Sequence, residues 1–441
     1  MEKHAEDENK AVHPGFWEAF RFWVKLGFIS FGGPAGQIAI MHKELVERKR
    51  WVSNRRFLNA LNYCMLLPGP EAQQLAVYIG WLLHNIRGGI VAGALFVIPS
   101  MFILFGLSYV YIVFGQIAWV ASIFDGLKAA VMAIVFGAVI RIGQKSLKNP
   151  VMISIAAGSF VAIYFFGVPF PAIVIGAGLI GLAGGILWPA KFDVLKSKSA
   201  KEGNLGSVQI SPGGQTGHLA PSNRRSLLLV IIFVVLWVVP VAALALLSHS
   251  PTFLTEALFF TKAAFLTFGG AYAVLPYVAQ AGVEQFGWLS GPQMIDGLGL
   301  AETTPGPLIM VLQFVGFMAG WNQPGAMTPL AGSILGSLVA TYFTFLPCFL
   351  FIFLGAPYIE KFSDNRRLSS ALSTITAAVV GVILNLAVWF GLQVLFPASG
   401  GIDYFSAAIG IAAFICIQKF KVDIIFVVAG AAGLGFLFYF I

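Results

Sequence analysis

Charged residues are scarce in this chain. Asp, Glu, Lys and Arg make up 10% of its 441 residues, whereas a soluble globular domain has about 25%. Apolar residues make up 58% and the mean hydropathy is +0.85. Uncharged runs such as 88–114 are long enough to cross about 30 Å of hydrocarbon as a helix. The composition excludes a soluble protein and predicts an all-α polytopic membrane protein.

Cysteine is scarce too, and several catalytic motifs are missing. Cys64, Cys348 and Cys416 lie in apolar segments without ligand-type spacing, which predicts small core residues and no disulfide or metal site. The chain has no G-x-x-x-x-G-K-[S/T] phosphate-binding motif and no H-E-x-x-H zinc motif. We therefore expect no cofactor and no catalytic residue, and ATP-driven transport and the commonest membrane enzymes are disfavoured. The polar first residues lack the apolar core of a signal peptide, so the first membrane segment is expected to direct insertion.

What the chain does have is a repeated set of helix breaks. Four landmarks of the first half recur 237 residues later (262 − 25 and 305 − 68). Lys25, Phe31-Gly32-Gly33, Trp51 and Pro68-Gly69-Pro70 correspond to Lys262, Phe268-Gly269-Gly270, Trp288 and Pro305-Gly306-Pro307. An interrupted backbone at membrane depth is tolerated only where it is buried in protein or lines a polar cavity. Such breaks are typical of the solute sites of transporters.

The apolar segments follow a pattern of six, one and six. This pattern predicts an N-terminal repeat (1–190), a flexible linker (191–225), a connecting transmembrane helix (226–250) and a C-terminal repeat (251–441). The linker assignment rests on its polar, Gly- and Ser-rich composition. Because one extra crossing separates the six-segment halves, the second half is expected to be inverted relative to the first, as in many secondary transporters.

Loop charges support the inversion. The loop after the fourth segment carries Arg141, Lys145 and Lys148, whereas its counterpart near 397–401 carries no Lys or Arg. Cytoplasmic loops are enriched in both residue types, which places the N-terminus and the linker in the cytoplasm and the C-terminus in the periplasm. The basic cluster at 43–56 also becomes cytoplasmic if 16–40 and 57–84 are re-entrant hairpins rather than full crossings, and we favour the hairpins.

Helices that restart after these breaks predict an anion site between the halves. A helix N-terminus presents free N–H groups and the positive end of the helix dipole. Each break by itself also fits a kink or close helix packing. The residues expected to bind substrate are Lys25, Phe31, Gly32, Gly33, Pro68, Gly69, Pro70, Gln73, Lys262, Gly269, Gly270, Thr303, Thr304, Pro305, Gly306 and Pro307.

Few charged residues lie inside the apolar segments. Lys25 and Lys262 are equivalent, and because an intramembrane lysine is costly they are expected to face a shared dianion, unless they snorkel to the membrane interface. Glu71, Asp296 and Glu302 lie near the Pro-Gly-Pro motifs. Loss of water favours the neutral form of a carboxyl group, so these three are expected to carry a coupling proton. Ion pairing or helix capping is the alternative for them.

The remaining charged residues in or near the apolar segments are expected to have structural roles. Asp125 and Lys128, three residues apart, fit a local ion pair at a membrane edge. Arg141 fits the cytoplasmic boundary, with substrate contact as the lesser alternative. The formal net charge of +8 fits Lys and Arg retained in cytoplasmic loops, and no nucleic-acid partner is expected.

At these residues the sequence resembles the chromate ion transporter family in its long, two-domain form. The resemblance covers nearly the whole chain outside the linker and rests on Phe31–Pro34, the basic segment 48–56, Pro68–Gln74, Phe268–Tyr272 and Thr303–Pro307. It implies a bacterial inner-membrane protein that exports chromate, driven by the membrane potential or a proton gradient, and so confers chromate resistance.

Other functions stay open. Sulfate has the same tetrahedral, dianionic shape, so a transporter of sulfate or another anion is the first alternative. A passive anion channel and a membrane enzyme acting on an anionic lipid are the others. The expected partners are chromate or sulfate as substrate, the lipid bilayer and protons as coupling ion, and a homodimer is left open.

Overall fold

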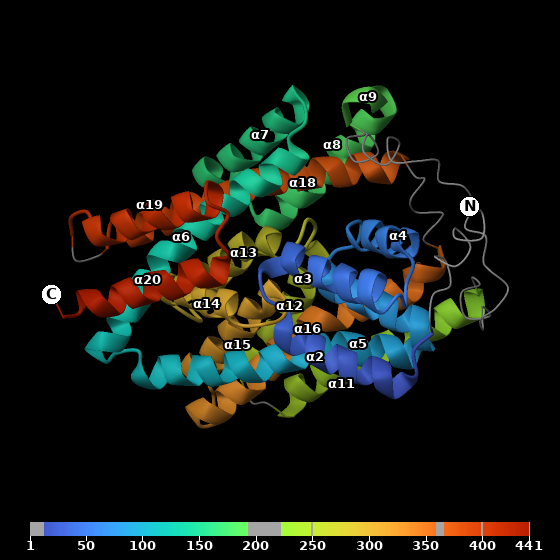
Figure 1. Ribbon diagram of the computed structural model, residues 1–441, viewed down its shortest axis with the longest axis horizontal. Helices are drawn as coiled ribbons and strands as arrows, with labels where there is room; N and C mark the ends of the chain where they lie inside the picture. Colours follow the sequence, from blue (N-terminus) through green and yellow to red (C-terminus); the bar gives the residue numbers. More distant parts are fainter. Residues whose placement is uncertain (1–12, 193–221, 248–249, 359–365, 398–399, 441) are drawn as a thin grey trace.

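Helices form all the regular structure in the described part of the chain, which contains no strand. The computed structural model describes residues 13–192, 222–247, 250–358, 366–397 and 400–440 (Figure 1). Most of the predicted linker, 191–225, therefore lies outside the described residues.

The first half contains nine helical elements among the described residues. These are α2 (Phe16–Ile29), α3 (Gly33–His42), the π-helix η1 (Lys43–Arg48), α4 (Asn54–Cys64), α5 (Glu71–Phe114), α6 (Ala118–Ser146), α7 (Pro150–Phe166), α8 (Phe170–Leu187) and the short α9 (Pro189–Phe192). The chain leaves the helical conformation between α2 and α3 and again at the first Pro-Gly-Pro motif. The predicted breaks are therefore present.

The second half follows the separate helix α11 (Asn223–Leu247) and repeats the same order. It contains α12 (Pro251–Leu266), α13 (Ala271–Gln280), η3 (Ala281–Gln285), α14 (Gly291–Thr303), η4 (Leu308–Met310), α15 (Val311–Asn322), α16 (Pro329–Gly355), η5 (Ala356–Tyr358), α18 (Arg366–Leu395), α19 (Tyr404–Gln418) and α20 (Ile424–Phe438). By position, α12, α13 and α14 correspond to α2, α3 and α4, and α18, α19 and α20 correspond to α6, α7 and α8.

The helix α5 is a hairpin rather than a single rod. His84 and Asn85 leave the helical conformation, with φ angles of −138° and +55°. Gly80 on the first arm lies directly against Gly88 and Ala92 on the second, so the two arms run antiparallel in close contact. Paired glycines join α15 to α16 in the same way. The hairpin of α5 is thus the counterpart of the α15–α16 pair.

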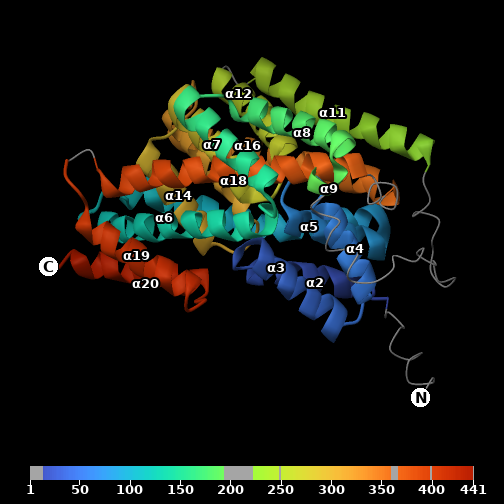
Figure 2. The same cartoon turned by 90° about the horizontal axis from the view of Figure 1, so that it is seen from above.

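The two halves exchange their long helices. The helix α6 of the first half packs against α19 and α20, and α18 of the second half packs against α7 and α8, as Figures 1 and 2 show. Glycines allow the backbones to touch, because a Cβ atom on Gly126 would overlap the carbonyl of Ala431 and one on Gly381 would overlap that of Ala156. Small residues allow this close approach between membrane helices. Each half therefore depends on the other for much of its packing.

Among the described residues, six helices are long and apolar enough to cross a membrane. They are α5, α6, α8, α11, α18 and the continuous run from Pro329 to Tyr358, and shorter apolar helices accompany them. The chain is therefore an all-α polytopic membrane protein, as predicted. The helices α2, α3 and α4 have 14, 10 and 11 residues. At about 1.5 Å per residue none of them spans the hydrocarbon alone, and the re-entrant arrangement stays a prediction.

Candidate functional site

The breaks of the two halves dock on each other through a reciprocal pair of hydrogen bonds. The N–H of Gly69 donates to the carbonyl of Thr267 at 2.7 Å, and the N–H of Gly306 donates to the carbonyl of Ser30 at 2.8 Å. Gly306 lies 237 residues after Gly69, and Thr267 lies 237 residues after Ser30. The Pro-Gly-Pro motif of each half therefore closes the first helix break of the other. The interrupted segments predicted from the repeat meet at the centre of the fold.

Both central glycines are required by their surroundings. Gly69 has a φ of +128° and Gly306 a φ of +101°, a region that residues with a side chain rarely adopt. A Cβ atom on Gly69 would lie 2.6 Å from Gln74 Nε2, and one on Gly306 would lie 2.7 Å from Ser100 Cβ. The docked geometry leaves room only for glycine at these two positions.

Acidic side chains from both halves converge on the start of α13. Glu71, the first residue of α5, has Oε1 3.8 Å from the Cβ position of Gly270, the N-cap residue directly before α13. Glu302, near the end of α14, accepts a hydrogen bond of 2.5 Å from the hydroxyl of Tyr272 in the first turn of α13. Two of the three acids predicted for proton coupling are therefore close to one helix N-terminus.

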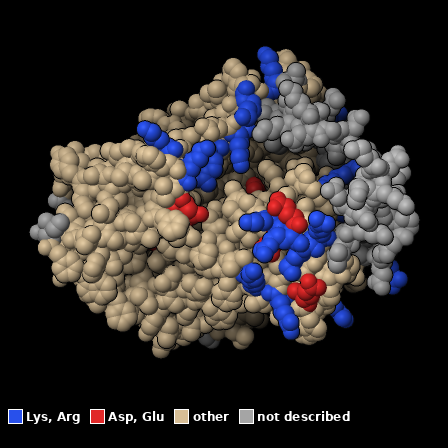
Figure 3. Space-filling view, viewed as in Figure 1, with Lys and Arg blue, Asp and Glu red and all other residues tan. Residues whose placement is uncertain are grey.

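Two basic residues of α6 balance these acids. Arg141 acts electrostatically on Glu302 and Tyr272, and Lys145, one helical turn later, acts on Glu71. Arg141 is half-buried and Lys145 is exposed. Figure 3 shows a hollow near the centre of one face, bordered by basic side chains and with an acidic side chain inside it. Two carboxyl groups therefore lie within the electrostatic influence of two basic side chains.

Several buried amide and hydroxyl atoms around the two motifs lack a protein partner within the described residues. Gln73 is fully buried, and neither its Oε1 nor its Nε2 has a hydrogen-bond partner. Gln37 Nε2 donates to the carbonyl of Gly306 at 2.5 Å and Gln74 Nε2 to that of Pro68 at 2.7 Å, while Oε1 of both stays open. Buried polar groups are nearly always satisfied by protein, water or a ligand. These open atoms indicate where a polar ligand can bind.

The other predicted residues of the breaks lie at the same interface, with their own contacts. Gly32, Gly33 and Gly269 have positive φ angles, as helix starts after a break require. Thr303 and Thr304 donate their hydroxyls to carbonyls of their own helix at 2.7 and 3.0 Å. Phe31 is half-buried, whereas Pro68, Pro70, Pro305 and Pro307 are buried at the docked motifs.

The structure does not bring the two predicted lysines together. Lys25 is exposed and lines an open pocket of about 420 Å³ with Arg21 and Lys49 of the first half. Lys262 is exposed and its Nζ lies 5.8 Å from the ring centroid of Tyr277 in the second half. Their predicted contact with substrate stays a prediction.

Asp296, the third predicted acid, lies apart from Glu71 and Glu302. It is buried on α14 and accepts a hydrogen bond of 2.9 Å from the hydroxyl of Tyr111 near the end of α5. Lys128 Nζ lies 3.9 Å from its Oδ1 and 3.0 Å from Asp125 Oδ1. The predicted local pair of Asp125 and Lys128 is therefore present, and it extends to a buried acid of the other half.

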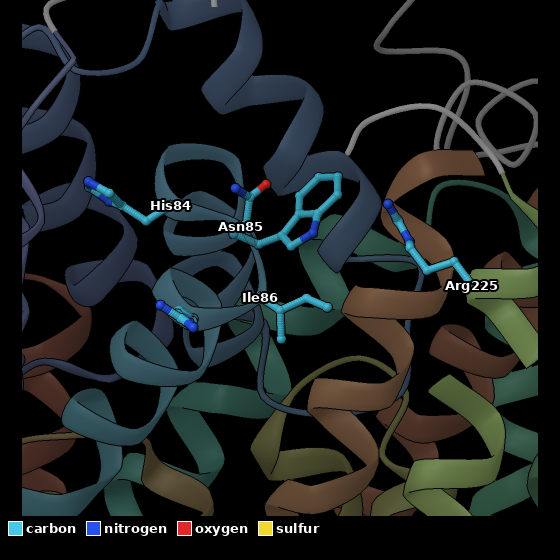
Figure 4. A pocket seen from close by; sticks show the side chains of 6 residues that line it. His84, Asn85, Ile86 and Arg225 are labelled. Carbon is cyan, nitrogen blue, oxygen red and sulfur yellow. The ribbon is translucent and has the colours of Figure 1, made fainter. Parts of the chain in front are cut away.

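A second open pocket lies at the tip of the α5 hairpin, away from the docked motifs. Its volume is about 490 Å³, and it is lined by residues 84–87, Trp81 and Arg225 at the start of α11. Figure 4 shows Arg225 on a different element from His84, Asn85 and Ile86 across this pocket. It shares no lining residue with the predicted site.

From the sequence alone, neither Tyr272 nor Lys145 is connected with this site, and a substrate contact of Arg141 is only the lesser alternative. Tyr272 belongs to a quoted motif, but nothing in its spacing connects it to Glu302, which lies thirty positions later. Arg141 and Lys145 fit a cytoplasmic loop by charge alone. Their approach to the acids depends on how α6 crosses the second half, which no local pattern reveals.

Comparison with known proteins gives a consistent result across the chain. The family described as chromate transporter matches residues 17–182 and again 254–436. A chromate transport protein of Pseudomonas aeruginosa is 30% identical over 451 aligned positions, covering 99% of this chain and 96% of that protein. One of Cupriavidus metallidurans is 28% identical, covering 95% and 92%. A probable chromate transport protein of Synechococcus elongatus is 28% identical, covering 96% and 97%.

No solved structure matches the chain significantly. The two family matches coincide with the two halves seen in the fold, since they begin within α2 and α12 and end within α8 and α20. The motifs at the docked breaks lie inside both matches. The chain therefore belongs to the chromate transporter family, a family of transporters and not of enzymes.

Proposed function

We propose that this protein is a secondary transporter that exports chromate across the bacterial inner membrane and so confers chromate resistance. Family membership and the names of the relatives support chromate as the substrate. The substrate-binding place in this proposal is the interface where each Pro-Gly-Pro motif meets the first helix break of the other half.

The fully buried and unpartnered Gln73 amide, within the first turn of α5, is the observation that carries the proposal. A tetrahedral oxyanion needs several donors that converge on it. The first N–H groups of a helix have no partner inside the helix and favour negative charge. The starts of α5 and α13, together with the buried Gln73 Nε2, supply such donors.

Charge balance explains how proton movement could be coupled to the anion. With Arg141 and Lys145 near Glu71 and Glu302, the site has as many cations as carboxyl groups. Protonation of either acid changes the charge that the site presents to a dianion, so proton binding and anion binding are linked. Glu71 and Glu302 are therefore the proposed coupling acids at the site, and Asp296 is a third at a distance.

In this proposal Lys25 and Lys262 attract the anion from exposed positions. An exposed cation raises the local concentration of an anion and the rate of its arrival, without being a ligand of the closed site. Substitution of either lysine tests whether it attracts the anion in this way or contacts the substrate directly, as the sequence predicts.

The proposed topology is an inverted repeat with the N-terminus in the cytoplasm and the C-terminus in the periplasm. The reciprocal hydrogen bonds of Gly69 and Gly306 support an approximate two-fold relation between the halves. The distribution of Lys and Arg between equivalent loops supports the direction of insertion.

Reconstitution in proteoliposomes tests the proposal. The wild-type protein is expected to show saturable chromate flux that follows an imposed pH gradient or membrane potential, with sulfate as a competitor. Sulfate flux without chromate flux would make sulfate the substrate, and flux that neither saturates nor responds to a gradient would indicate a passive channel. The absence of any anion flux would refute the proposal.

A further inference from the structure

Asp296 joins the two halves at a second place, separate from the docked motifs. Its carboxyl group, on α14 of the second half, contacts Tyr111 and Lys128, which belong to α5 and α6 of the first half. The helix α14 packs along α6, and the Cβ position of Gly299 lies 3.2 Å from Val131. Every partner of Asp296 named here therefore lies across the boundary between the halves.

Lys128 is shared unequally between two carboxyl groups. Its Nζ lies 3.0 Å from Oδ1 of Asp125, whose side chain is 53% exposed, and 3.9 Å from Oδ1 of Asp296, whose side chain is 5% exposed. That Asp296 oxygen has no hydrogen-bond partner within the described residues. A displacement of about 1 Å would bring Lys128 within hydrogen-bonding distance of it.

The net charge of this cluster depends on whether Asp296 carries a proton. Asp125, Lys128 and ionised Asp296 carry a net charge of −1, and a proton on Asp296 makes the cluster neutral. Among the described residues, the charged and titratable groups that act on Asp296 are Lys128 and Asp125 of α6 and Tyr111 of α5, while α15, α18 and α20, which also pack on α14, add none. Ionised Asp296 therefore attracts Lys128 across the boundary, and neutral Asp296 leaves Lys128 with Asp125 alone.

Lys128 lies in the first half of α6, whereas Arg141 and Lys145, the cations of the candidate site, lie near the end of this helix. Lys128 and Arg141 are thirteen residues apart on this helix, or about 20 Å along its axis. On α14, Asp296 and Glu302 are six residues apart, or about 9 Å. One pair of adjacent helices thus connects the cluster to the anion site.

We infer that Asp296, Lys128 and Tyr111 form a latch between the two halves that opens when Asp296 takes up a proton, at the end of the bundle where α5 meets α6. The inference rests on the proposed function and says how proton binding would control access of the anion to its site. Binding of a proton neutralises the carboxyl group, Lys128 stays with Asp125, and the halves can separate at this end. Release of the proton restores the ion pair and closes it.

Two transport assays on the full-length protein test the latch. Chromate exchange between equal concentrations needs no net proton movement, whereas uptake driven by a pH gradient does. Asp296→Asn, which cannot ionise but can keep a hydrogen bond to Tyr111, is expected to reduce gradient-driven uptake by about 5- to 150-fold and exchange much less. Equal loss of both activities, or gradient-driven uptake at the wild-type rate, would overturn the inference. Glu284→Gln, which neutralises an exposed acid of the same half, is the matched control and is expected to behave as wild type.

A labelling experiment separates failure of the latch from failure of the proposed function. Leu127 is buried beside Lys128 and lies against Gly299, so Leu127→Cys, in a chain whose native cysteines are replaced by alanine, reports opening at this end. A thiol reacts as its thiolate, so the rate with a membrane-impermeant thiol reagent is divided by the rate of the denatured protein at the same pH. This ratio is expected to rise at acid pH, and Asp296→Asn is expected to make it high at every pH. A labelling ratio of Leu127→Cys that changes neither with pH nor with Asp296→Asn would refute the latch, even if the wild-type protein transports chromate. Absence of chromate flux with the expected labelling would refute the proposed function alone.

Discussion

The docking of Gly306 on the first half gives the sharpest prediction of stability. Its φ of +101° costs a residue with a side chain about 1–3 kcal/mol. The Cβ atom of Gly306→Ala would lie 2.7 Å from Ser100 Cβ and 3.1 Å from Ser100 Oγ, and such overpacking costs about 1–3 kcal/mol more. We therefore expect Gly306→Ala to destabilise the folded protein by about 2–6 kcal/mol and to abolish chromate uptake.

The steric part of this cost can be tested by a second substitution in the other half. Ser100→Gly removes the Cβ and hydroxyl that the alanine would meet, at a cost of about 0.5–1 kcal/mol for glycine inside α5. The double variant is expected to recover the overpacking part but not the backbone strain. Gly106→Ala, six residues along α5 and with nothing within 4 Å of its Cβ position, is the control and should be at least as stable as wild type.

Thermal unfolding in detergent, followed by tryptophan fluorescence, measures these differences, and proteoliposome uptake measures their consequence. The reasoning would be refuted if Gly306→Ala unfolded at the wild-type temperature. It would also be refuted if the double variant with Ser100→Gly were no more stable than Gly306→Ala alone, because the contact between the halves would then not be the cause.

Two further predictions concern single side chains. Tyr272→Phe removes the hydroxyl that donates to Glu302 at 2.5 Å and leaves a buried carboxyl oxygen unpartnered, at a cost of about 1–3 kcal/mol. Chromate uptake should fall about tenfold, and adding Glu302→Gln should reduce it little further. Additive losses in the double variant would show that the two side chains act separately. Because Lys25 and Lys262 are exposed, Lys25→Ala or Lys262→Ala should slow chromate uptake by less than about tenfold and weaken the dependence of uptake on ionic strength. Complete loss of uptake in a correctly inserted variant would show that the lysine is part of the binding site.

Much of the fold could be predicted because membrane insertion depends on local properties of the chain. Apolar length predicts the crossing helices, and the placement of glycine and proline predicts the breaks before α3 and α5. The repeat at one offset predicts that α2 and α12, or Gly69 and Gly306, have equivalent positions. The break inside α5 was predicted too, since the apolar segment 57–84 ends where the uncharged run 88–114 has not yet begun.

The candidate site was predicted less completely, because its residues are far apart in the sequence. Glu71 and Glu302 were recognised as embedded acids from their local sequence. Their shared position at the start of α13 depends on contacts between halves that lie more than two hundred residues apart, and so does the approach of Arg141. Lys25 and Lys262 were predicted to face a shared anion but are exposed, because their equivalent positions in the repeat do not indicate which face of each helix is buried.

The amino-acid sequence by itself determined the class of this protein, its two related halves, its family and the places where its helices are interrupted. These follow from hydrophobic length, from the conformational limits of glycine and proline, and from the repeat. Only the tertiary structure decided that each Pro-Gly-Pro motif closes the break of the opposite half, that the long helices α6 and α18 are exchanged, and that Lys128 reaches a buried acid across the boundary. Such pairings arise from the way helices pack, and no neighbouring residues in the chain encode them.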